Sequence, residues 1–496
     1  MRHVSANLLL AAALLAGCAT STVTNPVSGR AERTVMDERT EIAEGQKAHQ
    51  QVLAEYGALD NPRLQAYVNG LGQRLAGASH RSGLEWHFTV LDSPEVNAFA
   101  LPGGYVYVTR GILAFMDSEA DLAGVIGHEI GHVTARHGAQ RATRQQNAGL
   151  GVLAATVLGL GLEGLLGVRG AAEAVSQVSQ GVAAGLIASY SRDQELQADQ
   201  LGAEYLARSR FNPKNMVDVI GLLKDQERFA ADSARADGRT APSGANWLSS
   251  HPSNDQRLQD IRQAAAAHRG PFDDDGRPRY LQAIDGITFG DGRAQGVVRG
   301  RQFFHEPLGL ALTAPAQWSL QNTPEAVLVV SPSEDAALVV RTLPPQAGNS
   351  HEEILRNLFK VTQGRTERLS LNGLEATHFV GQRANARGQP EPIELTLVNG
   401  PADRRYVLMA NGRDAAAVQR ARPGLREAEA SFRALTAADR AAARPWTIRS
   451  VALPAGGFAE LARRSPLPQA ERRLRLLNGI YAGGDLRPGQ MVKVVE

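Results

Sequence analysis

Cysteine is almost absent from this chain, since its 496 residues contain only Cys18. A single cysteine excludes an intramolecular disulfide, even in an oxidising compartment. An excess of charge of one sign is also lacking, because 53 Lys and Arg residues are balanced by 51 Asp and Glu residues, which leaves a formal net charge of +2. There is thus no basic excess to attract nucleic acid. The hydrophobic fraction of 43% and the charged fraction of 21% are typical of a soluble globular protein, and the length predicts two to four domains.

An uninterrupted hydrophobic run long enough to span a bilayer is also lacking. Residues 148–168 come closest, being rich in Gly, Ala, Leu and Val. However, Glu163 interrupts this run, glycines are frequent within it, and Arg169 follows it closely. We therefore expect residues 148–190 to form helices that cover the functional site or lie on a membrane surface. A transmembrane hairpin is the minority alternative.

The N-terminus has the pattern of a targeting signal. Residues 1–17 combine a positively charged start with an apolar run over residues 8–16, which is too short to span a bilayer as a mature helix. The run ends in Leu-Ala-Gly-Cys, which resembles a bacterial lipobox and implies cleavage before Cys18 and lipid attachment to that residue. Ala19 follows instead of Asp, which in lipoprotein sorting favours the outer membrane. We expect residues 18–34 to tether a periplasmic protein to that membrane.

One motif organises the chain, the sequence His-Glu-x-x-His from His128 to His132. Side chains four residues apart lie on one face of a helix, so the two histidines can occupy two corners of a tetrahedral zinc site. Glu129 can reach a metal-bound water and act as its general base. The His-Glu pairs at 305–306 and 351–352 lack the second histidine, and only the first copy has apolar flanks, which predict a buried helix.

A third metal ligand must come from elsewhere in the chain. Ala135 and Gly138 stand where the metzincin extension requires Gly and His, so that class is excluded. His137 lies on another face of the helix and is expected to be a surface residue or to support a ligand from behind. Glu195 and Asp199 are four residues apart on a second predicted helix. Glu195 can complete the zinc site, and Asp199 can hydrogen-bond the free nitrogen of a ligand histidine and fix its tautomer.

Three ordered motifs, at residues 97–104, 128–138 and 191–199, resemble those of the HtpX-like and CAAX-prenyl-protease-like zinc metallopeptidases. These enzymes are gluzincins, in which two histidines come from the motif helix and a glutamate from a later helix. The resemblance covers about residues 35–265. It implies one zinc ion per chain, with Glu195 as the third protein ligand.

The resemblance also implies roles for residues downstream of the motif helices. The sequence Ser-His-Pro-Ser at 250–253 is similar to a family motif that an arginine follows, here Arg257. His251 would contact the metal or stabilise the oxyanion of the tetrahedral intermediate, and Arg257 would pair with an acid such as Asp199. The alternative for His251 is a capping or surface histidine.

A turn at Pro102-Gly103-Gly104 leads into a predicted strand that begins at Tyr105. In zinc peptidases an edge strand beside the metal binds the substrate backbone by strand addition. The resemblance therefore favours Gly103, Gly104 and Tyr105 as substrate-binding residues, and an ordinary hairpin turn is the alternative.

The pattern predicts an α+β fold class with several parts. A mainly helical gluzincin-type peptidase domain with a small sheet is expected at 35–268, followed by a linker at 269–300. A separate α+β domain of unknown role is expected at 301–440. Residues 441–496 are expected to form a small C-terminal module whose ending resembles a LysM module, which binds cell-wall glycan. A plain packing module is the alternative there.

These residues predict a zinc endopeptidase of the bacterial cell envelope, in which Glu129 activates a zinc-bound water. The resemblance suggests unfolded or misassembled envelope proteins as substrates and peptidoglycan as a candidate partner. The alternative is a chaperone-like or scaffolding envelope lipoprotein with a latent zinc site.

Overall fold

The computed structural model describes residues 21–147, 190–236, 247–252, 255–272, 275–323, 326–385 and 388–496. The expected signal peptide, Cys18 and nearly all of the apolar stretch 148–190 lie outside these ranges. The chain divides into two compact units. The first contains the described residues of Met1–Leu153, Leu186–Phe289 and Thr447–Glu496, and the second those of Gly290–Trp446. None of the helices in the described ranges combines the length and apolar character that crossing a bilayer requires.

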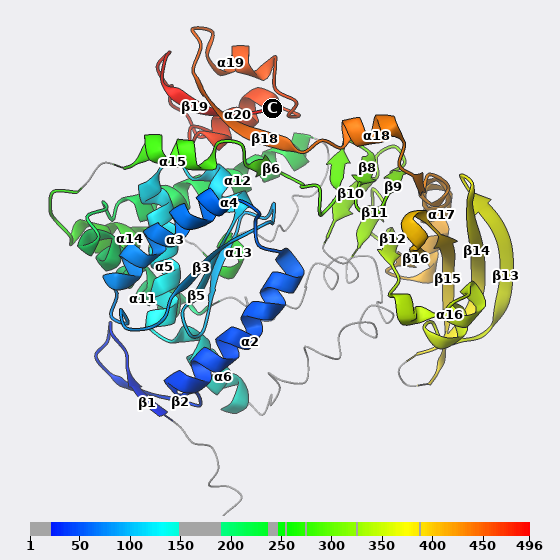
Figure 1. The fold of residues 1–496 in the computed structure, drawn as a ribbon, viewed down its shortest axis with the longest axis horizontal. Helices are drawn as coiled ribbons and strands as arrows, with labels where there is room; N and C mark the ends of the chain where they lie inside the picture. Colours follow the sequence, from blue (N-terminus) through cyan, green and yellow to red (C-terminus); the bar gives the residue numbers. More distant parts are fainter. Residues whose placement is uncertain are drawn as a thin grey trace, which may run out of the picture. The chain divides into compact units, whose positions relative to one another are not determined.

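Helices dominate the first unit (Figure 1). They are α2 (Glu38–Tyr56), α3 (Pro62–Gly77), α4 (Arg110–Phe115), α5 (Glu119–Thr134), α6 (His137–Asn147), α11 (Arg192–Arg208), α12 (Asn215–Ala236), α13 (Trp247–Ser250), α14 (Asp255–Ala266), α15 (Arg277–Ile284), α19 (Gly457–Ala462) and α20 (Ala470–Leu477).

Helix α5 is the centre of the first unit, since every one of its residues is buried. A helix that is buried all round must be covered on every side, and α5 packs against α3, α11 and α12. Ser118 caps its N-terminus by accepting a hydrogen bond from the backbone N–H of Asp121. The predicted buried motif helix is therefore confirmed.

The first unit has three small sheets. One contains β3 (His87–Leu91), β5 (Tyr105–Thr109) and β4 (Ala98–Leu101), in that order, with β3 parallel and β4 antiparallel to β5. The strand that begins at Tyr105 is thus central, and the edge strands are β3 and β4. The other two sheets are the hairpin β1 (Ser21–Thr24) and β2 (Ala31–Thr34), and the sheet of β19 (Met491–Val495), β18 (Trp446–Ala452) and β6 (Thr288–Phe289).

The C-terminal segment is built into the first unit. Strand β18 pairs with β19, and β6, from the range expected to be a linker, completes their sheet. Lys493 is fully buried and donates hydrogen bonds to the backbone oxygens of Ala114, Phe115 and Met116. Residues 269–300 also contain helix α15, so an ordered helix and strand occupy much of the expected linker.

The second unit is mostly antiparallel sheet. Its seven-stranded sheet has the order β10 (Ser319–Asn322), β11 (Val327–Val330), β12 (Ala336–Thr342), β16 (Arg405–Gly412), β15 (Pro390–Asn399), β14 (Leu374–Ala384), β13 (Val361–Leu371). A smaller sheet contains β17 (Arg433–Ala434), β9 (Leu310–Thr313), β8 (Gln302–His305) and β7 (Val297–Arg299). The helical elements are α16 (His351–Asn357), α17 (Ala415–Ala430), α18 (Ala437–Ala442) and the 3-10 turns η1 (Pro345–Ala347) and η2 (Pro401–Asp403).

The α+β character predicted for this part of the chain is confirmed, because the unit combines two sheets with helices α16, α17 and α18. The connection from β15 to β16 contains η2. Apolar residues of the large sheet pack with Leu425 and Ala428 of α17 in one core cluster.

Candidate metal centre

Two helices approach each other unusually closely at the motif, and glycines make this possible. A Cβ atom on Gly131 of α5 would lie 2.7 Å from the backbone oxygen of Ala198 on α11. A Cβ on Gly202 of α11 would lie 3.1 Å from the backbone nitrogen of His128. Larger residues would therefore force the helices apart. The close approach is what brings the acidic residues of α11 to the histidines of α5.

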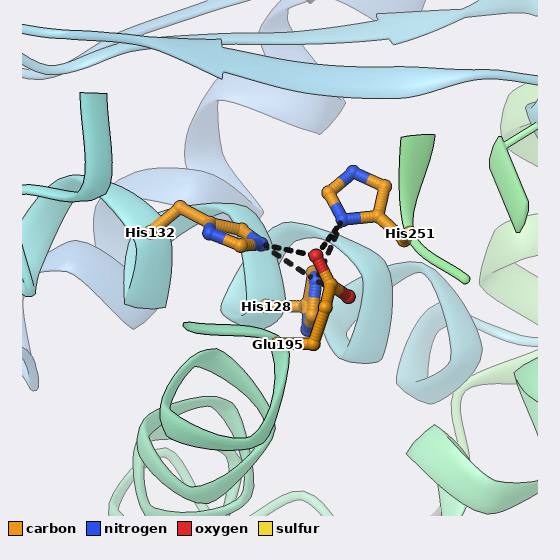
Figure 2. A group of neighbouring side chains, drawn as sticks. All are labelled: His128, His132, Glu195 and His251. Atoms are coloured by element: carbon orange, nitrogen blue, oxygen red, sulfur yellow. Dashed lines mark hydrogen bonds and ion pairs between the residues drawn. The ribbon is translucent and has the colours of Figure 1, made fainter. Parts of the chain in front are cut away.

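Four side chains converge at this contact: His128, His132, Glu195 and His251, here called the donor cluster (Figure 2). One nitrogen or oxygen atom of each lies within 4.8 Å of the others. His128 Nε2 is 3.0 Å from His132 Nε2 and 3.2 Å from His251 Nδ1. Glu195 Oε1 is 3.0 Å from His251 Nδ1 and 3.5 Å from His132 Nε2. All four residues are at most 1% exposed, so solvent does not satisfy these atoms.

The donor cluster suits a metal ion chemically. His128 Nδ1 lies 2.8 Å from Asp199 Oδ1, which places the proton of the neutral ring on Nδ1 and leaves a lone pair on Nε2. Burial, together with the neighbouring His128, holds the pKa of His132 well below its ordinary value, so this ring is neutral as well. Burial opposes the protonation of His251, but the carboxylates of Glu195 and Glu129 outweigh it and raise the pKa of this ring. Imidazole nitrogens and a carboxylate that face one another in a buried space are the ligand set that zinc prefers.

Asp199 and Arg257 lie directly behind the donor cluster. Arg257 donates from Nε and Nη2 to the two carboxylate oxygens of Asp199, at 2.8 and 2.9 Å. Its Nη1 lies 2.7 Å from Glu195 Oε2 and donates to the backbone oxygen of His251. Burial opposes the ionisation of Asp199, but Arg257 outweighs it and keeps the pKa of this carboxyl below its ordinary value. The structure thus brings together the pair that the sequence suggested.

Glu129 lies beside the donor cluster without belonging to it. Its Oε1 accepts a hydrogen bond from the indole N–H of Trp247 at 2.9 Å and lies 3.4 Å from His251 Nε2. Its Oε2 is buried and has no hydrogen-bond partner among the described residues. Glu129 therefore has one carboxylate oxygen available next to the site, as a general base would require.

Three more residues lie near the site, and two of them, Trp247 and Tyr190, were not assigned there from the sequence. Trp247 contacts Glu129, and Tyr190 stacks on His132 with ring centroids 3.9 Å apart. His137 is fully buried, and its Nδ1 lies 2.8 Å from His132 Nδ1. The sequence allowed either a surface position for His137 or a position behind a ligand, and the structure has the second. The only sequence signal for Trp247 was its place four residues before His251, on the same face of a helical turn.

Gly103 and Gly104 shape a turn whose backbone packs against its neighbours. Both have positive φ values, 81° and 96°, that other residues adopt at a cost. A Cβ on Gly103 would lie 2.7 Å from the Cα of Ile42, and one on Gly104 would lie 2.4 Å from the backbone oxygen of Glu85. Tyr105 begins the central strand β5. The edge strand β4 instead supplies Ala100 and Leu101 to a small pocket that His132 and Tyr190 also line.

Comparisons with known proteins agree with this geometry. Residues 62–265 match the model of peptidase family M48. The chain is 32% identical over 234 residues to the beta-barrel assembly-enhancing protease of Yersinia pestis, which covers 45% of this chain and 44% of that protein. It is 30% identical over 247 residues to the protein of that name from Escherichia coli K12, covering 50% of this chain and 48% of the relative.

A eukaryotic relative is also similar. The mitochondrial metalloendopeptidase OMA1 of Schizosaccharomyces pombe is 30% identical over 243 residues, or 48% of this chain and 65% of the relative. The chain spans about half the length of the bacterial relatives described above. M48 metallopeptidases use zinc, and the donor cluster lies inside the matched region, so the predicted zinc cofactor is confirmed.

Proposed function

We propose that this protein is a zinc-dependent endopeptidase of the bacterial cell envelope that degrades unfolded or misassembled envelope proteins. One observation carries the proposal: a buried set of metal donors with Glu129 directly beside it. The M48 match and the names of the relatives support the same reaction class. The name of the bacterial relatives further suggests β-barrel proteins of the outer membrane as a substrate class for this chain.

In this proposal His128, His132 and Glu195 hold the zinc ion. Zinc bound there would act as a Lewis acid that polarises the scissile carbonyl and makes water a stronger acid. Glu129 takes the proton of the attacking water with its free carboxylate oxygen. Asp199 keeps the proton of His128 on Nδ1, so that Nε2 faces the metal position.

Whether a metal ion at this site would have an open coordination position depends on His251. Catalytic zinc sites have three protein ligands and an open position, whereas structural sites have four. His251 supplies a fourth donor, and Trp247 on the same segment holds Glu129. We infer that His251 leaves its position as a donor when a substrate binds and, from beside the metal position, stabilises the oxyanion. The fully buried arrangement also favours the second candidate function, a chaperone-like or scaffolding lipoprotein whose zinc site is latent.

Strand β4 is the proposed site of substrate binding. It has a strand neighbour on one side only, so a peptide could add to the other side if the segments that bury β4 give way. Strand addition recognises the backbone more than the sequence of a peptide. Gly103 and Gly104 would contribute by setting the turn from β4 to β5, and Tyr105 by packing at its end. Anchoring to the outer membrane through Cys18, and glycan binding by the LysM-like C-terminal residues, remain proposals from the sequence.

Proteolysis by the purified full chain separates the two functions. The chain is incubated with an unfolded polypeptide such as reduced casein, with and without a chelator, and the fragments are analysed by mass spectrometry. Cleavage that the chelator abolishes and added zinc restores supports the endopeptidase. If zinc-loaded protein suppresses aggregation of the substrate but never cleaves it, the scaffolding or chaperone function is the better description.

A further inference from the structure

Among the described strands, the most exposed is β13, which lies at the edge of the seven-stranded sheet (Figure 1). It has eleven residues, and residues 362–368 are all exposed, on both faces. The other edge strand of the sheet, β10, has only four residues, each half-buried. Proteins usually protect an edge strand by making it short or covering it. β10 follows that practice, whereas β13 presents a long, open row of backbone groups.

The turn after β13 determines which backbone groups face outward. Asn372 and Gly373 form a two-residue connection to β14, and both have positive φ values, 50° and 87°. This is the geometry of a type I′ hairpin, in which Leu371 and Leu374 form the first hydrogen-bonded pair. Hydrogen-bonded and non-bonded pairs alternate along an antiparallel ladder. Even-numbered residues of β13 therefore direct their N–H and C=O groups to the open edge: Gly364, Thr366, Arg368 and Ser370.

Opposite charges flank the middle of this edge. Arg365 and Glu367 point to the same face of the sheet, one on each side of Thr366. Neither of them forms an ion pair with the described part of the chain. Beside Arg365 on β14 is Val380, which is 39% exposed and is one of the few large apolar side chains open to solvent among the described residues. The edge is thus charged, and Arg365 and Glu367 have no ion-pair partner among the residues that the structure describes.

We propose that β13 pairs antiparallel with β13 of a second copy of this chain, in the register centred on Thr366. The two Thr366 residues then face each other as a hydrogen-bonded pair, and Gly364 of each copy is opposite Arg368 of the other. Arg365 of each copy lies directly opposite Glu367 of the other, so the symmetry forms two cross-strand ion pairs. The arginine stems also cover Val380, which lies one strand further in.

Charge complementarity selects this register over its neighbours. The outward N–H and C=O groups of the even-numbered residues can bond only to those of even-numbered residues in the other copy. The two strands can therefore slide past each other only in steps of two residues, which moves the centre of the pairing by one residue. Centring on Arg365, Glu367 or Arg368 would instead each place two identical charges opposite one another. Centring on Gly364 places Lys360 opposite Arg368. Like charges directly opposite one another destabilise a strand pair. Of the five registers, only the one centred on Thr366 places opposite charges across from each other, and the other four place like charges there.

The charges on an edge strand can also serve to prevent pairing, and this is the simplest competing explanation. It predicts that the signs of the charges do not matter, as long as charges are present. Self-pairing through Thr366 predicts the opposite, since the association must depend on which sign stands at each position. A third occupant, an extended segment of another protein, would need the outward N–H groups but not the arrangement of Arg365 and Glu367.

Sedimentation velocity of the full chain over a range of concentrations tests the proposal. We expect a monomer–dimer equilibrium that 0.5 M salt weakens, because the paired charges are exposed. Arg365→Glu should weaken dimerisation by about tenfold or more, and so should Glu367→Arg. The exchanged variant Arg365→Glu/Glu367→Arg should dimerise as well as the wild type, because each new glutamate again faces an arginine.

Thr366→Pro supplies a backbone test with little risk to the fold. Its outward N–H is lost, and an edge strand tolerates proline at such a position. The variant should be monomeric with unchanged circular dichroism, while Thr362→Val, an exposed change outside the centre, should dimerise normally. A wild-type chain that stays monomeric at about 100 μM, or an exchanged variant as weak as the single ones, would overturn the proposal. None of these outcomes depends on the zinc site.

Discussion

Trp247 donates its indole N–H to the Oε1 of Glu129 at 2.9 Å, and this contact joins the segment that covers the site to its proposed general base. Both residues are at most 2% exposed. The hydrogen bond leaves Oε2 of Glu129 free, so one carboxylate carries both a structural contact and a catalytic atom. Replacing the carboxylate with an amide can therefore separate these two roles.

Glu129→Gln should keep the fold and the zinc ion but lose proteolysis by about a hundredfold or more, the usual scale for removing a general base. The amide oxygen can still accept the hydrogen bond from Trp247, whereas an amide cannot take a proton from water. Cleavage rates and zinc content are measured on the same preparation. Glu227→Gln, an exposed change on α12, serves as the control. Near wild-type cleavage by Glu129→Gln would rule out the general-base role.

His132→Ala should remove stoichiometric zinc. The wild type should contain about one equivalent by elemental analysis, and the variant well below that, because two donors on one helix face are reduced to one. His80→Ala removes a partly exposed histidine that contacts Tyr205 away from the donor cluster, and it should retain zinc. Full zinc occupancy in His132→Ala would show that the metal binds elsewhere.

The sequence was most informative where the structure depends on short-range spacing. His128 and His132 are on one helical turn, so periodicity alone placed them together. Glu195 is on a different helix, where its spacing from Asp199 made it a candidate ligand and the family resemblance supported that choice. Tyr190 reaches the site through tertiary packing that no local pattern encodes, since its ring stacks on His132 of α5. Lys493 shows the same limit, since a lysine near a chain end is normally exposed, yet it is fully buried here.

Asp199→Asn should weaken zinc binding by about ten- to a hundredfold, the range typical for partners that orient ligand histidines. The asparagine can present its N–H₂ group to His128 Nδ1 and so favour the wrong tautomer, which puts the proton on the nitrogen that faces the metal. Zinc affinity is measured by competition with a chromophoric chelator. Asp193→Asn, an exposed change on the same helix, should bind zinc like the wild type. If Asp199→Asn and Asp193→Asn bound zinc with equal affinity, Asp199 would have no role in orienting His128 for the metal.

The last prediction concerns the attachment of the C-terminal segment to the peptidase helices. Lys493 Nζ lies 3.2 Å from Asp117 Oδ1 and donates to three backbone oxygens at the end of α4. Lys493→Met keeps the length of the side chain but leaves these acceptors unsatisfied. Breaking a buried pair costs about 3–5 kcal/mol, and we expect the lower end because Arg277 still contacts Asp117.

Hydrogen exchange measured by mass spectrometry reports this attachment directly. In Lys493→Met, amides of β19 and α20 should exchange about a hundredfold faster, while those of β14 and β15 in the other unit should not change. Lys47→Met, an exposed control on α2, should have no effect.

Burial opposes the ionisation of Asp117, but Lys493 and Arg277 outweigh it and hold its pKa below the ordinary 3.8. This carboxylate therefore stabilises the fold above about pH 4, and its contribution is lost as the pH falls through the lowered pKa. The difference between the variant and the wild type should shrink over that same acidic range, and a difference independent of pH would exclude the Asp117–Lys493 pair as its cause.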